Sequence, residues 1–338
     1  MRYAEVGVSL KDQEQFVTLI KALKGPSAEQ IGRFAGLFDL ASVLQEYKHP
    51  LLVSSTDGIG SKTQLAVAYG QLDGLGQDLV AMNVNDLATL GARPLFFLDY
   101  YGAARLDLRQ GEVLLRGLIR ACEQAGCTLL GGETAQLTDL YRSRSALELV
   151  GFVVGIVDRP KLPDPAQLRP GDRLIGLPAS GPHCNGYSLI RMIIAERKLD
   201  LRKSYPEAGE RSLGQLLLEP MPIYSKVALE LFERFPVKGA AHITGSGIPG
   251  NLPRVLSRQV DALLEASAWP RLQIFEALQR WGDVPDDEMW DVFNMGLGFI
   301  VILPAAQADE ALRFLEQRGE RAYLIGEIER GKGTVRRV

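Results

Sequence analysis

The chain has 338 residues, enough for two domains of ordinary size. Hydrophobic residues make up 46% of it and charged residues 23%, which is typical of a soluble globular protein. The net charge of −3 gives no basic surface for nucleic acid, and no apolar run is long enough for a membrane span. The start of the chain lacks the apolar segment of a signal peptide. We therefore expect a cytoplasmic protein with reduced thiols that binds neither nucleic acid nor membrane.

Apolar periodicity predicts the regular elements of the first half. Helical spacing predicts helices over 13–24, 78–90 and 112–125, the last of them ending at Gly126. Short apolar runs predict strands over 50–54, 94–101, 127–130 and 147–157. Residues 32–38 are expected to form a glycine-punctuated loop before the first strand.

A proline-rich stretch divides the chain. Residues 158–172 contain four prolines, so we place a domain boundary near residue 165 and predict domains over 1–165 and 166–338. In the second half the pattern predicts helices over 186–195, 224–235 and 307–318, and strands over 173–177, 240–244, 296–303 and 322–326. This alternation predicts an α/β (α+β) fold with two domains.

The stretch Ser55-Thr-Asp-Gly-Ile-Gly-Ser-Lys62 follows the first predicted strand. Its glycines would let backbone amides approach phosphate oxygens, Asp57 would hold a divalent cation, and Lys62 would neutralise phosphate charge. The stretch is not a P-loop, because Ser61 rather than a glycine precedes the lysine. A strand-to-loop turn with no ligand is the alternative interpretation.

Two further acids stand at boundaries between apolar segments and loops. Asp86 follows Asn85, and Glu133 follows two glycines. Magnesium prefers oxygen ligands and usually takes one or two carboxylates together with substrate phosphates. Taken singly, Asp86 is explained as a helix residue paired with a cation, Glu133 as a helix cap, and Asp99 as a satisfied structural carboxylate. Taken together, Asp57, Asp86 and Glu133 favour a metal site.

Two glycine-containing loops of the second half each join a predicted strand to a helix. They are Ser180-Gly-Pro-His-Cys-Asn-Gly186 and His242-Ile-Thr-Gly-Ser-Gly-Ile248. Free amides at a helix start favour an anion, so a phosphate of a second substrate would suit either loop. His183 and Asn185 are candidate hydrogen-bonding groups, whereas His242 is expected to be structural. Cys122 and Cys127 are expected to serve packing. Cys184, in the first of these loops, is a candidate to face a ligand, but no base and orienting group stand near it to form a nucleophilic triad.

Together these motifs resemble the aminoimidazole ribonucleotide synthetase (phosphoribosylformylglycinamidine cyclo-ligase) family nearly from end to end. The matching stretches are Tyr3–Val8, Ser55–Lys62, Asp78–Leu87, Gly91–Tyr101, Gly131–Ala135, Ser180–Leu189, His242–Gly247, Asn251–Val255 and Phe293–Gly296. The sequence departs from the family pattern at Ala35, Gln136–Tyr141, Arg142–Ser145 and Ser246.

The resemblance implies an ATP-dependent ligase of purine biosynthesis. It would close the imidazole ring of formylglycinamidine ribonucleotide, giving 5-aminoimidazole ribonucleotide, ADP and phosphate. It also implies a homodimer in which the mixed sheet of each N-terminal domain forms a barrel-like core with its counterpart, while the C-terminal α/β domain serves the substrate.

Residue roles follow from motif position within this resemblance. Magnesium is assigned to Asp57, Asp86 and Glu133. ATP is assigned to Thr56, Gly58, Gly60, Lys62 and Asn85. The substrate is assigned to Ser180, His183, Asn185, Thr244 and Gly245. The catalytic set is Asp57, Lys62, Asp86 and His183.

Two alternatives remain open. One is a thiamine monophosphate kinase-like phosphotransferase of the same superfamily, and the other is a non-catalytic nucleotide-binding paralogue. A selenophosphate synthetase is disfavoured, because no cysteine precedes Cys122 in this chain.

Overall fold

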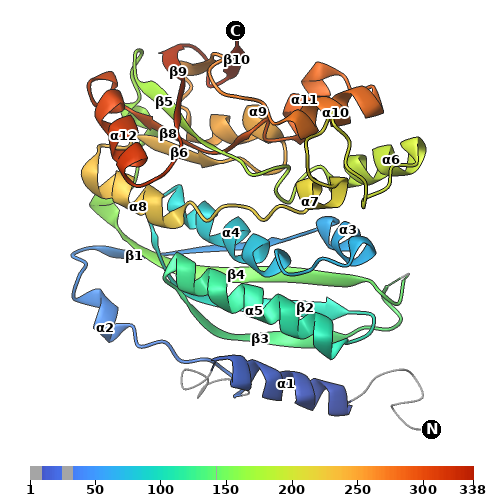
Figure 1. Ribbon diagram of the computed structural model, residues 1–338. Coiled ribbons are helices and arrows are strands. Elements are labelled where there is room, and N and C mark those ends of the chain that lie inside the picture. The colour runs from blue at the N-terminus through green and yellow to red at the C-terminus, as the bar shows by residue number, and fades with distance from the viewer. Residues whose placement is uncertain (1–9, 25–32, 142) are drawn as a thin grey trace.

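The computed structural model describes residues 10–24, 33–141 and 143–338, and Figure 1 shows their arrangement. The family match at Tyr3–Val8 and the departure at Arg142 lie outside these residues. Two sheets dominate the described part, one in each half of the chain. The mixed α/β architecture predicted from the sequence is confirmed.

The first sheet has four strands in the order β1-β4-β2-β3. Their bounds are β1 Pro50–Gly58, β2 Arg93–Ala103, β3 Thr128–Gln136 and β4 Leu147–Asp158. β4 runs antiparallel to β1 and β2, while β2 and β3 are parallel, so the sheet is mixed. Burial alternates along β1 and along most of β4, with the odd-numbered side chains covered by helices and the even-numbered ones on the other face.

Helices α4 (Leu75–Ala88) and α5 (Leu108–Ala125) cover one face of this sheet. α4 is buried on nearly all sides because it lies between the sheet and the second half of the chain. α5 begins at Asp107, whose carboxylate accepts two backbone N–H groups, and ends at Gly126 in the left-handed conformation. The two helices approach closely at Gly76, where a Cβ atom would lie 2.3 Å from the backbone N of Leu118.

The second sheet has six strands in the order β10-β7-β9-β5-β8-β6. Their bounds are β5 Arg173–Pro178, β6 Gly239–His242, β7 Val260–Leu264, β8 Leu297–Leu303, β9 Tyr323–Arg330 and β10 Val335–Arg337. Every residue of β8 is buried, because apolar clusters cover both faces of the sheet. One cluster includes α8 and α12, and the other includes α6 and α10.

The remaining helices are short or peripheral. Their bounds, with those of the helices just named, are α1 Leu10–Lys24, α2 Ala41–Leu44, α3 Lys62–Tyr69, α6 Tyr187–Arg197, α7 Leu213–Leu217, α8 Ser225–Arg234, α9 Gly247–Asn251, α10 Gln273–Gly282, α11 Asp286–Val292 and α12 Ala305–Gln317. No helix of the described ranges combines the length and apolarity that a membrane crossing needs.

The predicted long helices and strands are present, but several strands extend further than predicted, and two of them extend into the glycine-containing motifs. β1 continues through Asp57 to Gly58, and β3 continues through Glu133 to Gln136. Both stretches were expected to be loops because of their glycines. The first sheet ends at Asp158 and the second begins at Arg173. The domain boundary near residue 165 stays a prediction.

Candidate active site

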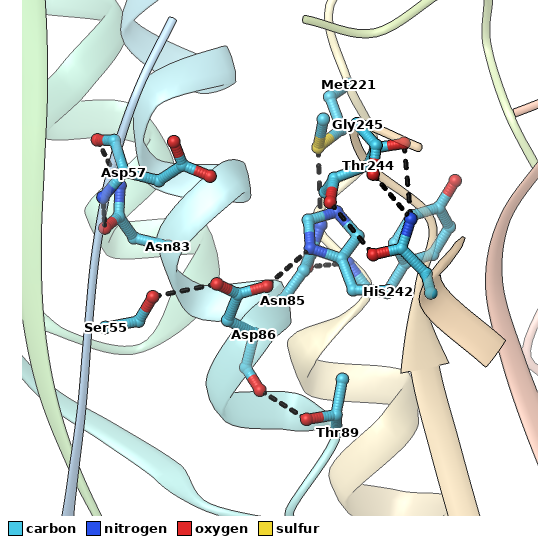
Figure 2. A network of polar contacts seen from close by, with 12 residues as sticks. Ser55, Asp57, Asn83, Asn85, Asp86, Thr89, Met221, His242, Thr244 and Gly245 are labelled. Carbon is cyan, nitrogen blue, oxygen red and sulfur yellow. Dashed lines mark hydrogen bonds and ion pairs between the residues drawn. The ribbon is translucent and has the colours of Figure 1, made fainter. Parts of the chain in front are cut away.

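A pocket of about 520 Å³ opens where the first sheet and α4 meet β6 of the second half. Asp57 of β1 and Asp86 of α4 line one wall, and His242 of β6 lines another, as Figure 2 shows. The rest of the lining includes Thr89, Asn185, Thr244, Gly245, Ser246, Asn251 and Arg254. The structure therefore brings five predicted site residues together: Asp57, Asp86, Asn185, Thr244 and Gly245.

Asp86 is held by two hydrogen-bonding partners (Figure 2). Its Oδ1 atom lies 2.9 Å from Nδ1 of His242, and its Oδ2 atom accepts a hydrogen bond of 2.8 Å from Ser55 Oγ. Burial opposes ionisation, but the hydrogen bond and charge of His242, with the Ser55 contact, outweigh it and lower the pKa of Asp86. The carboxylate stays 40% exposed while the His242 ring is buried, so a charged Asp86 faces the pocket.

Asp57 presents the second carboxylate of the pocket. Its backbone N–H donates to Asn83 Oδ1 at 2.9 Å, and its own Oδ1 accepts from the Gly58 amide at 2.7 Å. Burial raises the pKa of Asp57 and the charge of Asp86 adds to this rise, against the Gly58 amide and His242. Two mutually repelling carboxylates in one pocket suit a divalent cation. Within the described residues no group of three or more His, Cys, Asp or Glu side chains is arranged to hold a metal ion.

Lys62 does not face this pocket. It begins α3 with a fully buried side chain whose Nζ atom lies 2.6 Å from Oδ2 of Asp78, which is buried as well. The same ammonium donates to the carbonyl of Glu219 at 3.1 Å. A phosphate contact would require leaving Asp78 buried without its cation, at a cost of about 3–5 kcal/mol. The predicted phosphate contact of Lys62 is therefore not available in this conformation.

Asn85 and Ser180 also point away from the pocket. Asn85 Nδ2 donates to the carbonyl of Pro222, and its Oδ1 accepts from the amide of Tyr224. Ser180 Oγ donates to the carbonyl of Pro220. Both side chains hold the segment 220–224 against the two halves of the chain, which is a different role from the predicted contacts with ATP and substrate.

His183 lies beneath the loop and does not line the pocket. Its side chain is fully buried, and its Nε2 atom accepts a hydrogen bond of 3.3 Å from the Ser180 amide. Burial, with the charges of His242 and Lys62, lowers the pKa of His183 well below its usual range. The ring is therefore neutral, and its arrangement supports the loop that carries Asn185 into the pocket. The structure thus places His183 below the pocket, and its catalytic role stays a prediction.

Glu133 is not brought together with Asp57 and Asp86. In the register of the sheet, Asp57 is paired with Gly151 and Gly151 with Asp99. Asp99 is in turn paired with Gly132. The line from Asp57 to Gly132 crosses three strand spacings, about 14 Å. Paired residues share a face, so Glu133, one residue further on, points to the opposite face from Asp57.

The other residues predicted to contact ATP are Thr56, Gly58 and Gly60. Thr56 lies on the face opposite to Asp57, and its hydroxyl donates to the carbonyl of Gly151 at 2.9 Å. Gly58 is the last residue of β1, beside Asp57. Gly60 adopts φ of 64° in the turn before α3, a conformation that favours glycine, and a Cβ atom there would meet open space. These glycines shape the turn beside Asp57.

A second lobe of about 540 Å³ adjoins the first pocket. Both lobes are lined by Asn185, Gly245 and Ser246, and the second lobe also includes Asp291. His242, Arg254 and Asp291 were not predicted from the sequence as residues of the site. His242 ends a strand directly before a glycine loop, as Asp57 nearly does, and this shared position was a signal that could have found it.

Two models of one protein family match the two halves of the chain. The family model for the AIR synthase related protein N-terminal domain matches residues 38–157, and the model for its C-terminal domain matches residues 169–338. A phosphoribosylformylglycinamidine cyclo-ligase of Anaeromyxobacter dehalogenans is 44% identical over 98% of this chain and 96% of that protein. The chain belongs to the phosphoribosylformylglycinamidine cyclo-ligase family. Members from Myxococcus xanthus (44% identical, 98% of this chain and 96% of that protein) and Cupriavidus necator (42%, 100% and 96%) agree with this.

Solved structures outside the family share the fold. A thiamine-monophosphate kinase from Stenotrophomonas maltophilia is 20% identical with a TM-score of 0.67, covering 94% of this chain and 95% of that one. A hydrogenase maturation protein HypE in complex with ATP is 18% identical with a TM-score of 0.68, covering 96% and 90%. At these identities the likeness concerns the fold alone.

Proposed function

We propose that the protein catalyses the ATP-dependent ring closure of formylglycinamidine ribonucleotide to 5-aminoimidazole ribonucleotide, ADP and phosphate, in cytoplasmic purine biosynthesis. The observation that carries this proposal is 44% identity to a cyclo-ligase over nearly the whole of both chains. The kinase alternative is supported by a fold shared at 20% identity, which is much weaker.

The reaction needs two steps. The formamide oxygen of the substrate attacks the γ-phosphorus of ATP while the formamide nitrogen loses its proton, the bond from that phosphorus to the bridging oxygen of ADP breaks, and an iminophosphate forms. A nitrogen of the substrate then attacks the activated carbon, the carbon–oxygen bond breaks, and phosphate leaves as the ring closes. Both nucleophiles belong to the substrate, so the protein chiefly positions the groups and stabilises charge.

Asp57 and Asp86 are the residues proposed to hold magnesium with the phosphates of ATP. Their carboxylate oxygens are the ligand type that this ion prefers, and both line the same pocket. Bound magnesium would neutralise charge that develops on the phosphates. His242 and Ser55 fix the orientation of Asp86 through their contacts with its two oxygens. Arg254, on the same pocket, is the cation we propose to contact phosphate.

Asn185, Thr244 and Gly245 are proposed to contact the ribonucleotide. The loop that carries the last two is braced by Asn251, whose Nδ2 atom donates to the carbonyls of Gly245 and Gly247 at 2.9 and 2.7 Å. Because these hydrogen bonds already order the loop, substrate binding would cost less conformational entropy there.

An assay of ATP-dependent aminoimidazole ribonucleotide formation tests the function. Asp86→Asn should reduce kcat/KM at least about 100-fold and raise the magnesium concentration needed for half activity, because a charged ligand is lost. Asp309→Asn, an exposed change on α12, is the matched control and should behave as wild type.

Three outcomes would contradict this proposal. Unchanged turnover and magnesium dependence in Asp86→Asn would remove the metal role of Asp86. ATP binding without phosphate release in the presence of authentic substrate would favour a non-catalytic paralogue. Phosphorylation of thiamine monophosphate would favour the kinase.

We further propose that the protein acts as a homodimer that pairs the uncovered faces of two four-stranded sheets. On this face the side chains of Leu52 and Phe152 are 62% and 38% exposed, which is unusual for a sheet of apolar strands. Glu133 lies on this same face, and would therefore be near the dimer interface rather than near Asp57 of its own chain.

A further inference from the structure

Ser246 stands where the two lobes of the pocket meet. It lines both lobes, together with Asn185 and Gly245. The side chain is exposed, and within the described part of the chain its hydroxyl has no hydrogen-bond partner. The hydroxyl is therefore available to a molecule that extends from one lobe to the other.

The backbone of Ser246 is held in a conformation that suits glycine better. Its φ and ψ are 73° and 13°, in the left-handed region where a Cβ atom is disfavoured. The neighbouring chain is shaped around this side chain, because a Cβ atom on Gly250 would lie 2.3 Å from Cβ of Ser246. Non-glycine residues in this conformation are enriched at binding sites, and at Ser246 it coincides with a hydroxyl that lines a pocket.

The charges of the two lobes differ. The first lobe contains Arg254 with Asp57 and Asp86, a set that suits phosphates and a cation. The lining residues of the second lobe include Asp291 and no lysine or arginine. A phosphate would be repelled there, whereas hydroxyl or amide groups would be accepted.

We propose that the Ser246 hydroxyl binds a neutral hydrogen-bonding group of the ribonucleotide substrate, a ribose hydroxyl or an amide, where this substrate passes from the first lobe into the second. Ser246 is thus a substrate-contacting residue of this chain. The inference rests on the proposed function, because it takes the substrate from there.

The test compares Ser246→Ala and Ser246→Gly with wild type. Calorimetry without ATP measures the affinity for formylglycinamidine ribonucleotide, and thermal unfolding measures stability. Both variants should bind this ribonucleotide about fivefold more weakly, the value of one neutral hydrogen bond, with kcat within about twofold and an unchanged KM for ATP. Ser246→Gly alone should raise Tm, because it alone removes the left-handed Cβ.

Lys198→Gly is the matched control for backbone strain. Lys198 ends α6 in the left-handed conformation with φ of 54° and is exposed. Its replacement should raise Tm and leave substrate affinity unchanged, which separates strain from binding.

Wild-type affinity in Ser246→Ala would overturn the inference, as would equal weakening by Lys198→Gly. Binding of the ribonucleotide without turnover would contradict the proposed function alone, since the comparison of affinities would still decide the role of Ser246. Failure of the wild-type protein to bind the ribonucleotide would overturn both.

Discussion

Asp99 shows how the burial of a single carboxyl group makes folding depend on pH. It lies on the helix-covered face of the first sheet and borders a small apolar cavity with Phe16 and Leu79. Burial outweighs the hydrogen bond from its own amide and raises the pKa of Asp99 from 3.8 to about 7. The sequence indicated a satisfied structural carboxylate at this position, and the structure instead favours the protonated form below about pH 7.

The sign of the effect follows from proton binding. Between pH 4 and pH 7 the folded state holds a proton on Asp99 that the unfolded state has lost, so stability falls as the pH rises through this window. Asp99→Asn removes the effect, and at pH 8 it should be more stable than wild type by at most about 4 kcal/mol. Urea unfolding at pH 5 and pH 8 measures it, and equal gains at both pH values would contradict the explanation.

Asp158 offers a control of opposite sign. Its carboxylate accepts hydrogen bonds from the amides of His49 and Lys48, which lower the pKa of Asp158. The stability that it contributes is present at neutral pH and is lost as the pH falls through its lowered pKa. Asp158→Asn should therefore destabilise the protein more at neutral pH than at strongly acid pH.

At the scale of elements, the buried pair of Lys62 and Asp78 joins α3 and α4 to the second half of the chain. Asp78 Oδ1 also accepts from the amide of Met221 at 2.8 Å. Lys62→Met should lower the free energy of unfolding by about 3–5 kcal/mol, because it leaves Asp78 buried without its cation. Urea unfolding measures this loss.

The controls for this change separate the two interpretations of Lys62. Lys226→Met, at an exposed position of α8, should leave stability within about 0.5 kcal/mol of wild type. A second change, Asp78→Leu in the Lys62→Met background, should restore part of the loss. Wild-type stability of Lys62→Met with a raised KM for ATP would contradict the buried role and support the predicted phosphate contact.

The longer elements were predictable because a burial pattern repeats along them. The predicted helix over 112–125 lies within α5, and the predicted strand over 147–157 nearly equals β4. Helices such as α7 and α9 have five residues each, too few for a helical period to be recognised. Glycines in β3 were interpreted as a loop, yet Gly132 is needed for packing, since a Cβ atom there would lie 2.2 Å from Asp99 Oδ1.

The candidate site was predictable where a polar residue lies near the end of an element or in the loop beside it. Asp57 and Asp86 lie near the ends of β1 and α4, and Asn185 lies in the loop before α6, and all three line the pocket. Lys62 and His183 stand beside such residues in the sequence, but both side chains are fully buried. Burial depends on the contacts between the two halves of the chain, which a local motif does not contain.

At the scale of the whole molecule, we relate the uncovered face of the first sheet to assembly, because apolar side chains are exposed on it. Leu52 of β1 and Phe152 of β4 project from it, while Val150 and Val154 are half-buried beside them. In the register of the sheet, Leu52 is paired with Ile156, which is buried with Val43 and Leu95 at that end of the face, and Phe152 is paired with Thr56 further along. The exposed part of the face is therefore the part around Leu52 and Phe152. Pairing this surface with a second copy would remove the apolar area from water.

Phe152→Glu tests the dimer, because it would bury an unpaired charge in the proposed interface. The variant should raise the dimer dissociation constant at least about 30-fold in sedimentation equilibrium, while the wild-type protein sediments as a dimer at micromolar concentration. Leu324→Glu is the matched control, since Leu324 of β9 is 40% exposed and lies on the other sheet, so its variant should remain dimeric. A wild-type protein that is monomeric at concentrations where it is active would contradict the proposed assembly. Equal dissociation of both variants would show that the uncovered face is not the interface.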